Sequence, residues 1–215
     1  MKILLSGGGE PEQVKPLDDY FAKSMNGGKV LYIPVAMYKV PYNECNKIKK
    51  GVCFKMKEWF KKTYEYCNFD IDMCTDLSKI KSLDEYTGVF IGGGNTFKLL
   101  KEIKESKFDI LLEKYLKNGG FVYGGSAGAI IFGKSIETSS HADKNIVGLT
   151  ELSGLNMLNG FDVWCHYNPK EDNNNIMNLK NSTKVLYEES GLLFDGKNFK
   201  SIGKDSLTYP EDFIG

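Results

Sequence analysis

Short apolar runs alternate with amphipathic segments along the first two thirds of the chain. The apolar runs have the length of buried strands, and they lie at residues 2–7, 29–36, 69–74, 88–94 and 121–125. Between them, apolar residues at helical spacing predict helices at about 12–25, 52–66, from 95 or 96 onward, and through 111–120. Strands that alternate with helices predict an α/β fold, with a mostly parallel sheet and helices on both faces.

The pattern changes beyond about residue 134. Short strand-like segments separated by polar or Asn-rich turns follow, at residues 134–140, 160–167, 184–190, 191–196 and 197–203. They predict a continuation of the sheet and a hairpin extension toward the C-terminus. Because the chain has 215 residues, with no linker and no internal repeat, we expect residues 1–215 to form a single α/β domain.

Three glycine-rich turns follow predicted strands, with the sequences SGGGE at 6–10, IGGGN at 91–95 and YGGSAG at 123–128. In open parallel sheets, ligands bind beyond the carboxyl ends of the strands. Three such turns at one edge of the sheet therefore predict the rim of an active site.

The third turn holds a candidate nucleophile, Ser126. Residues 124–128, GGSAG, fit the G-x-S-x-G elbow, a strand-turn-helix that exposes the serine hydroxyl. The amide of Ala127 would then be one oxyanion donor, and Gly93 or Gly94 would supply a second from the neighbouring turn. A tight strand-to-helix turn can also need glycine for packing alone, so the motif by itself leaves both interpretations open.

A nucleophilic serine needs a base, and the chain has only two histidines, His141 and His166. His166 ends a strand-like run and precedes a turn at 167–169, so we predict that it is the base. His141 lies in the polar stretch TSSHADKN, which predicts a surface loop and a candidate lid around His141 and Asp143. Either Glu188 or Glu189 can orient the imidazole, because adjacent strand residues face opposite ways.

Two further patterns were weighed against this interpretation. Residues 128–135, GAIIFGKS, match the P-loop consensus, but the gap is apolar and a strand-like segment follows instead of a long helix. We interpret the match as a coincidence. Cys165 beside His166 suggests a thiol nucleophile, but its strand position predicts that it faces the core.

The composition limits the class of partner. The formal net charge is zero, which argues against nucleic acid or an anionic membrane surface as the main partner. All 28 basic residues are lysines, so the planar guanidinium that binds carboxylates in a fork is missing. No apolar run reaches the length of a membrane span, and the N-terminus predicts a first strand and not a signal peptide.

The five cysteines are odd in number and form no CxxC pair. This usage predicts free thiols in a reducing cytosol, and hence a cytoplasmic location. With only two histidines in the chain, we expect no metal site.

The order and spacing of IGGGNTFKLL and the Gly-Ser-Ala-Gly elbow about thirty residues later, followed by a histidine and a glutamate, resemble the peptidase E family of serine peptidases. That family includes aspartyl dipeptidases and cyanophycinase relatives. The resemblance runs from the first strand to about residue 200. It implies a flavodoxin-like fold related to class I glutamine amidotransferases, and a Ser-His-Glu triad in that chain order.

The resemblance also implies roles for individual residues. Ser126 corresponds to the nucleophile and His166 to the base. The family glutamate follows a strand in a Leu-x-Glu context, which matches 186–188 and favours Glu188, with Glu189 in reserve.

The oxyanion donors implied by the resemblance are the amides of Gly93 and Ala127, and we expect Gly94 and Asn95 to contact the substrate. No metal or organic cofactor is expected. The implied partner is a small peptide substrate, and a homodimer is possible.

Two departures from the family pattern bear on specificity. Members that cleave after an N-terminal aspartate need a cation for its carboxylate, typically arginine, and this chain has none. The proline near the histidine also follows His166, whereas in aspartyl dipeptidases it precedes the histidine. We therefore predict a serine peptidase acting on small peptides, with its side-chain preference open. The alternatives are a nonenzymatic module that binds a small ligand and, more weakly, a nucleotide hydrolase using residues 128–135.

Overall fold

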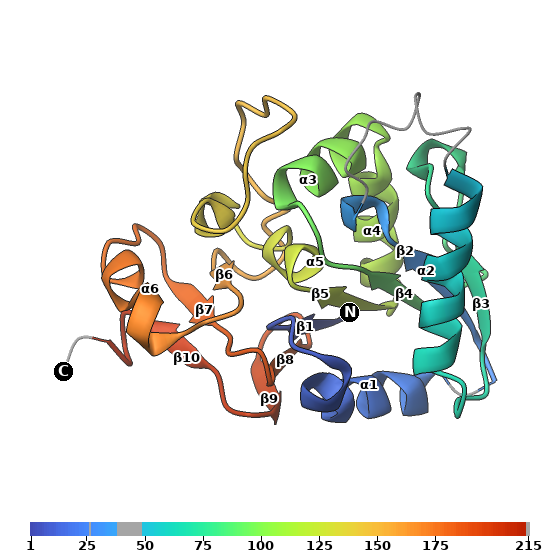
Figure 1. The fold of residues 1–215 in the computed structure, drawn as a ribbon, viewed down its shortest axis with the longest axis horizontal. Coiled ribbons are helices and arrows are strands. Elements are labelled where there is room, and N and C mark those ends of the chain that lie inside the picture. The colour runs from blue at the N-terminus through green and yellow to red at the C-terminus, as the bar shows by residue number, and fades with distance from the viewer. Residues whose placement is uncertain (26, 38–48, 214–215) are drawn as a thin grey trace.

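A seven-stranded sheet forms the centre of the molecule (Figure 1). The computed structural model describes residues 1–25, 27–37 and 49–213, and the side chains of these residues except those of 49–55. The strands lie in the order β3-β2-β4-β5-β1-β8-β9. Their bounds are β1 Lys2–Ser6, β2 Lys29–Ile33, β3 Asp70–Met73, β4 Gly88–Ile91, β5 Phe121–Gly125, β8 Ser190–Phe194 and β9 Phe199–Gly203.

The first five strands are parallel, and β8 and β9 extend the sheet as an antiparallel hairpin beside β1. Ser6 pairs with Gly125, and Ile91 pairs with Gly124. The carboxyl ends of β1, β4 and β5 therefore meet at one edge, and the three glycine-rich turns follow them there. The predicted α/β fold and the shared edge are both confirmed.

Helices cover both faces of the sheet (Figure 1). Alternate residues of β1 show the division, because Ile3 and Leu5 belong to one buried cluster and Leu4 to the other. The helices α3, α4 and α5 pack on the first face, and α1 and α2 pack on the second. Their bounds are α1 Pro11–Ser24, α2 Lys49–Thr63, α3 Thr96–Glu105, α4 Phe108–Lys117 and α5 Ala127–Ile130.

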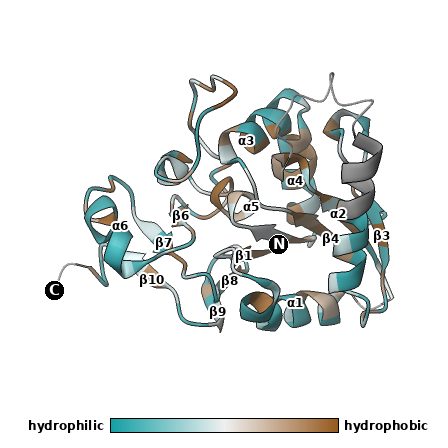
Figure 2. Ribbon diagram, in the orientation of Figure 1, coloured by the Kyte–Doolittle hydropathy of each residue, from teal (hydrophilic) through white to brown (hydrophobic). Residues whose placement is uncertain are grey.

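Figure 2 shows apolar residues gathered on the central strands, with hydrophilic residues on the outer sides of the helices. The second face is rich in aromatic side chains. Phe21 of α1 lies edge-on to Phe90 and Tyr123 of the sheet, and Phe60 of α2 stacks on Tyr32 at 4.1 Å between ring centroids. Edge-on and offset aromatic pairs stabilise a core beyond the area they bury.

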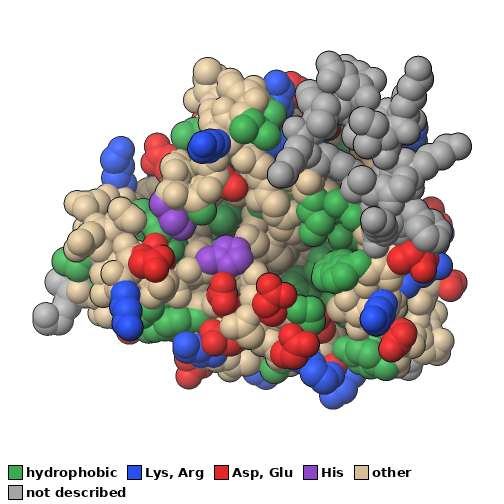
Figure 3. Space-filling view, in the orientation of Figure 1, with side chains coloured by type: hydrophobic (Ala, Val, Ile, Leu, Met, Phe, Trp, Pro, Cys, Tyr) green, Lys and Arg blue, Asp and Glu red, His purple; other side chains and the backbone are tan. Residues whose placement is uncertain are grey.

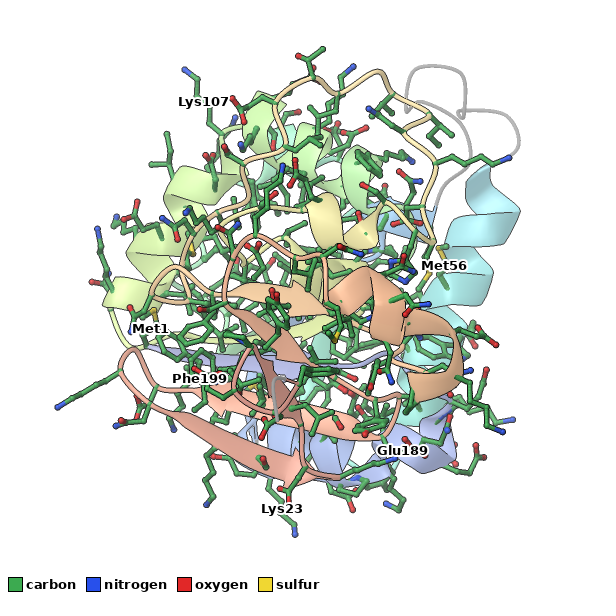
Figure 4. The ribbon with its side chains drawn as sticks, turned by 90° about the vertical axis from the view of Figure 1, so that its left-hand side faces the viewer. Met1, Lys23, Met56, Lys107, Glu189 and Phe199 are labelled. Carbon is green, nitrogen blue, oxygen red and sulfur yellow. The ribbon has the colours of Figure 1, made fainter. Side chains whose placement is uncertain are left out.

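A second, three-stranded sheet lies beside the main one, in the order β10-β7-β6. Its strands are β6 Asp162–Trp164, β7 Thr183–Val185 and β10 Leu207–Tyr209, and α6 Pro169–Ile176 packs with them. Phe161 and Phe199 join the two sheets, with ring centroids 5.5 Å apart (Figure 4 labels Phe199). The sequence predicted one continuous sheet here, and it did not predict α6 or β10.

Residues 134–140 form a turn, so the strand predicted there from the sequence was wrong. Glu137–Ser139 is a short 3₁₀ helix, η4, and Ser135 makes only an isolated bridge to Ser153. Two further 3₁₀ turns are η1 Val35–Met37 and η3 Leu77–Lys79. In the corrected segment the backbone amide of Ser135 donates to Asp162 (2.7 Å) and the Ser139 hydroxyl donates to the Ile136 carbonyl (2.8 Å). Such local side-chain bonds compete with strand pairing.

Candidate active site

Ser126 occupies a strained turn between β5 and α5. Its backbone dihedrals are φ 50° and ψ −112°, outside the regions favoured by residues with a side chain. The amide of Ser126 donates to the carbonyl of Ser6 at 3.1 Å, which fixes the turn to the end of β1. Strain of this kind is typical of functional residues that surrounding structure holds in place.

His166 lies directly against Ser126. Its Nε2 atom is 2.8 Å from Ser126 Oγ, within hydrogen-bonding distance. The residue follows β6 with a positive φ of 56°, and its backbone amide donates to the Gly7 carbonyl at 3.0 Å. The structure thus brings together the predicted serine and histidine from elements forty residues apart.

Glu188 approaches the other side of the imidazole. Its Oε1 atom lies 3.6 Å from His166 Nδ1, and its Oε2 atom accepts a hydrogen bond from Gln13 Nε2 at 3.2 Å. Glu189 instead faces Lys204, 3.8 Å away (Figure 4 labels Glu189). Of the two glutamates that the sequence left open, only Glu188 is beside the histidine.

Gly8 is a site residue that was not predicted individually, although its turn was predicted to lie at the rim of the active site. Its φ is +99°, and a Cβ atom there would lie 2.5 Å from the His166 ring and 2.8 Å from Ser126 Cβ. Both the dihedral and the contact require glycine. The signal in the sequence was the SGGGE turn itself.

The predicted oxyanion donors lie next to Ser126. A Cβ atom on Gly93 would be 3.2 Å from Ser126 Cβ, so the Gly93 backbone passes close to the serine. Ala127 is the first residue of α5, where amides have no partner within the helix. Neither amide donates a hydrogen bond to another residue of the described part of the chain.

Gly94 and Asn95, predicted to contact substrate, make structural contacts. A Cβ atom on Gly94, at φ +128°, would lie 2.5 Å from the backbone of Ala36. The Asn95 side chain caps α3 by accepting from the Lys98 amide at 3.0 Å, and it donates to the Lys144 carbonyl at 2.8 Å. The start of this helix at residue 95 or 96 was predicted from the sequence, and contact with substrate stays a prediction.

The loop around His141 is bound to its neighbours. The His141 ring stacks on Trp164 at 4.0 Å, and its Nδ1 atom lies 2.8 Å from the Thr138 carbonyl. Asp143 accepts a hydrogen bond from the Thr96 amide at the start of α3. The structure does not bring His141 to Ser126, and closure of this loop over a substrate stays a prediction.

The structure also bears on the P-loop match at 128–135 and on Cys165 as a nucleophile. Residues 128–135 begin inside the short helix α5 and continue as turns, and the next helix is only η4, so the geometry of a P-loop is missing there. Cys165 is 1% exposed, as predicted, and burial raises the pKa of its thiol. Cys45 and Cys53 lie outside the residues whose side chains are described.

A cavity of about 200 Å³ opens beside Ser126. Figure 3 shows this face of the molecule, where hydrophobic side chains edge a hollow next to the histidines. The carboxyl end of the sheet forms one wall of the cavity, and α1 and α2 form the other. The lining residues are Ser6, Gly8, Gly9, Pro11, Val14, Asp18, Met37, Trp59, Thr63, Tyr64, Phe90, Gly92, Gly93, Tyr123, Gly125 and Ser126.

Asp18 is the charged residue of this lining, and it is only 6% exposed. Burial raises the pKa of its carboxyl group to about 6, although hydrogen bonds from Tyr64 and Tyr123 act in the opposite direction. The Tyr64 hydroxyl donates to Asp18 Oδ1 at 2.8 Å. Asp18 was not predicted from the sequence, because two adjacent aspartates on an amphipathic helix are usually solvated.

No cluster of three or more potential metal ligands occurs among the side chains of residues 1–25, 27–37 and 56–213. Within the same residues, no helix combines the length and apolar character that a membrane crossing requires.

Comparison with known proteins identifies the family. Peptidase family S51 matches residues 3–202, and the chain belongs to this family. It is accordingly a serine-type peptidase, and the alternative of a nonenzymatic binding module is not favoured. The predicted resemblance to peptidase E is confirmed.

Several individual proteins are similar to the chain. The uncharacterized peptidase Lmo0363 of Listeria monocytogenes is 30% identical over 164 residues, which is 73% of this chain and 74% of that protein. A probable alpha-aspartyl dipeptidase of Drosophila melanogaster is 31% identical over 58% of this chain, and a peptidase E of Shewanella denitrificans is 27% identical over 73%. The chain spans only 47% and 58% of the lengths of the latter two proteins.

A crystal structure of a putative peptidase E protein from Listeria monocytogenes shares the fold. The TM-score is 0.72 at 23% identity, and the alignment covers 95% of this chain and 98% of that one. A peptidase from an acI-B1 Actinobacterium gives a TM-score of 0.59 at 12% identity, over 97% of this chain and 96% of that one.

The buried carboxylate of Asp18 predicts a pH-dependent stability. Its folded pKa of about 6 lies above the ordinary 3.8, so its favourable contribution is complete below about pH 4 and is lost as the pH rises through about 6. Between about pH 4 and pH 8 the unfolding free energy of wild type should therefore fall by about 3 kcal/mol relative to that of Asp18→Asn, in which residue 18 does not titrate. Urea unfolding of both proteins at the two pH values checks this, and an equal difference at both would contradict it.

Proposed function

We propose that the protein hydrolyses peptide bonds in small peptides through an acyl-enzyme on Ser126. The observation that carries the proposal is the 2.8 Å distance between Ser126 Oγ and His166 Nε2, in a strained turn at the edge of the sheet. In this arrangement the neutral imidazole accepts the hydroxyl proton while Oγ attacks the scissile carbonyl carbon.

The amides of Gly93 and Ala127 bind the oxyanion that forms. Both belong to residues beside Ser126, and neither donates a hydrogen bond to another described residue. Donors that are already in position where negative charge develops stabilise the transition state strongly, because they need no reorganisation during the reaction.

Glu188 keeps the proton on Nδ1 of His166, so that Nε2 is free to accept. The 3.6 Å separation supports this role, and Gln13 holds the carboxylate through its second oxygen. The resulting imidazolium then gives its proton to the leaving amine. Water, activated by the same imidazole, releases the acyl group and regenerates Ser126.

Small substrates suit the dimensions of the cavity. Its volume of about 200 Å³ is below that of pockets for drug-sized ligands, so it accommodates one side chain. One relative is described as a probable alpha-aspartyl dipeptidase, which supports short peptides as the substrate class. It does not support aspartate as the substrate side chain that enters the cavity, because the chain has no arginine and the cavity holds a carboxylate.

Replacement of the nucleophile tests the proposal. We expect Ser126→Ala to lower turnover of a dipeptide library by about 10⁴-fold or more, since removal of a triad serine leaves only binding and oxyanion stabilisation. A fluorophosphonate probe should label wild type and not this variant. Circular dichroism provides the folding control. Hydrolysis that persists in a folded Ser126→Ala protein would refute the mechanism.

The two adjacent glutamates offer a matched pair of variants. Glu188→Gln removes the charge beside His166 and should lower kcat by at least about tenfold, because the imidazolium loses its partner. Glu189→Gln removes an exposed ion pair with Lys204 and should leave kcat within about twofold of wild type. Steady-state kinetics on one dipeptide distinguishes them, and equal effects of the two changes would argue against the assigned triad.

A further inference from the structure

We propose that the cavity beside Ser126 selects substrates that carry a positively charged ammonium group on the residue whose carbonyl is attacked. Asp18 would be the recognition residue. This inference rests on the proposed function, and it adds a substrate class that the aspartyl dipeptidase relatives would not suggest.

The position of the cavity assigns it to the acyl side of the scissile bond. Ser126 and Gly93 both line the cavity, whereas His166 does not. The leaving amine must lie near Nε2 of His166, because that atom supplies its proton. The leaving group therefore departs away from the cavity, and the cavity receives the residue that becomes bonded to Ser126.

The described lining of the cavity carries a negative charge. Asp18 is the one carboxylic acid among these residues, and none of them is a lysine. Lys15, on the same helix, is exposed and binds Asp19 at 2.8 Å instead. Asp18 forms no ion pair within the described part of the chain, and burial raises its pKa more than the charge of Lys15 lowers it. A charge held away from water without such a pair is in an unfavourable state.

An incoming ammonium group would supply that partner. Tyr64 occupies Oδ1 of Asp18, and a carboxylate has further lone pairs that accept hydrogen bonds. Hydrogen bonds between an ammonium and a carboxylate are shorter and stronger than neutral ones. A substrate carboxylate would instead be repelled, so the same residue excludes an acidic side chain from this position.

The walls of the cavity suit the rest of such a substrate. Trp59, Tyr64, Phe90 and Tyr123 line it with aromatic rings. Lysine has a flexible four-carbon stem that packs on apolar surface, and an ammonium is attracted to the face of an aromatic ring. The α-ammonium of an N-terminal residue has the same charge and donors, so the experiment must separate the two sources.

The selectivity should depend on pH. The titratable and charged groups around Asp18 are Tyr64 directly after α2, Tyr123 of β5, and Asp19 and Lys15 of its own helix. The tyrosines stay neutral because burial raises the pKa of each well above its ordinary value. Preference for an ammonium should therefore decline as the pH falls through about 6, where Asp18 becomes protonated.

The test compares kcat/KM for four dipeptides: Lys-Leu, norleucyl-Leu, Asp-Leu and N-acetyl-Lys-Leu. Norleucine retains the straight side chain of lysine without its charge. The enzymes are wild type, Asp18→Asn and the matched control Asp19→Asn, whose change lies one residue away on the same helix. The ratio of kcat/KM for two substrates cancels any effect of pH on the catalytic residues, since both substrates use the same residues.

We expect wild type to prefer Lys-Leu over norleucyl-Leu by about tenfold or more, as charge-assisted hydrogen bonds predict. The preference should vanish in Asp18→Asn and persist in Asp19→Asn. If kcat/KM falls only when the α-amino group is acetylated, and only in enzymes that retain Asp18, the α-ammonium is the group recognised. Equal rates for all four peptides, a preference for Asp-Leu, or selectivity unaffected by Asp18→Asn would overturn the proposal.

A binding measurement separates failure of this inference from failure of the proposed chemistry. Calorimetry with lysinamide and norleucinamide on the Ser126→Ala protein, with and without Asp18→Asn, requires no turnover. If wild type hydrolyses no peptide but lysinamide binding still depends on Asp18, the peptidase mechanism is refuted and the ammonium site is retained. Hydrolysis without any dependence on Asp18 would refute the ammonium site alone.

Discussion

The backbone of the first glycine turn, residues 7–9, holds the candidate active site together. The Gly7 carbonyl accepts from the His166 amide, and the Gly9 amide donates to the Glu188 carbonyl. Between them, Gly8 lies against the imidazole ring and Ser126 with no space for a side chain. One turn therefore sets the distances among three residues that follow β5, β6 and β7 in the chain. The main sheet and the second sheet meet here.

Much of this arrangement follows from the sequence, because strand periodicity and glycine turns are local signals. They place the turns at one edge of a parallel sheet and identify Ser126 at the elbow. The choice between Glu188 and Glu189 could not be made in this way, because it depends on the path of the chain after β7 and on where Lys204 lies. The second sheet was missed for a similar reason, since its strands are three residues long and their pairing is set by tertiary contacts.

Asp18 shows how a site can oppose stability. A carboxylate buried against Tyr64 and other aromatic side chains weakens the folded state at neutral pH, because burial raises its pKa more than its hydrogen bonds and the charge of Lys15 lower it. The same carboxylate gives the cavity a charge that a substrate can neutralise. Its role was not visible in the sequence, because Asp18 and Asp19 are identical residues side by side and only packing distinguishes the buried one from the exposed one.

The most direct test of this account replaces Gly8 by alanine and measures labelling by a fluorophosphonate probe. Gly119→Ala is the matched control, because Gly119 also has a positive φ, of +91°, but nothing lies within 4 Å of an added Cβ atom. The account predicts that the folded Gly8→Ala protein loses labelling, since the added methyl group displaces His166 from Ser126, while Gly119→Ala is labelled as wild type is. Labelling of Gly8→Ala at the wild-type rate would contradict the central role of this turn.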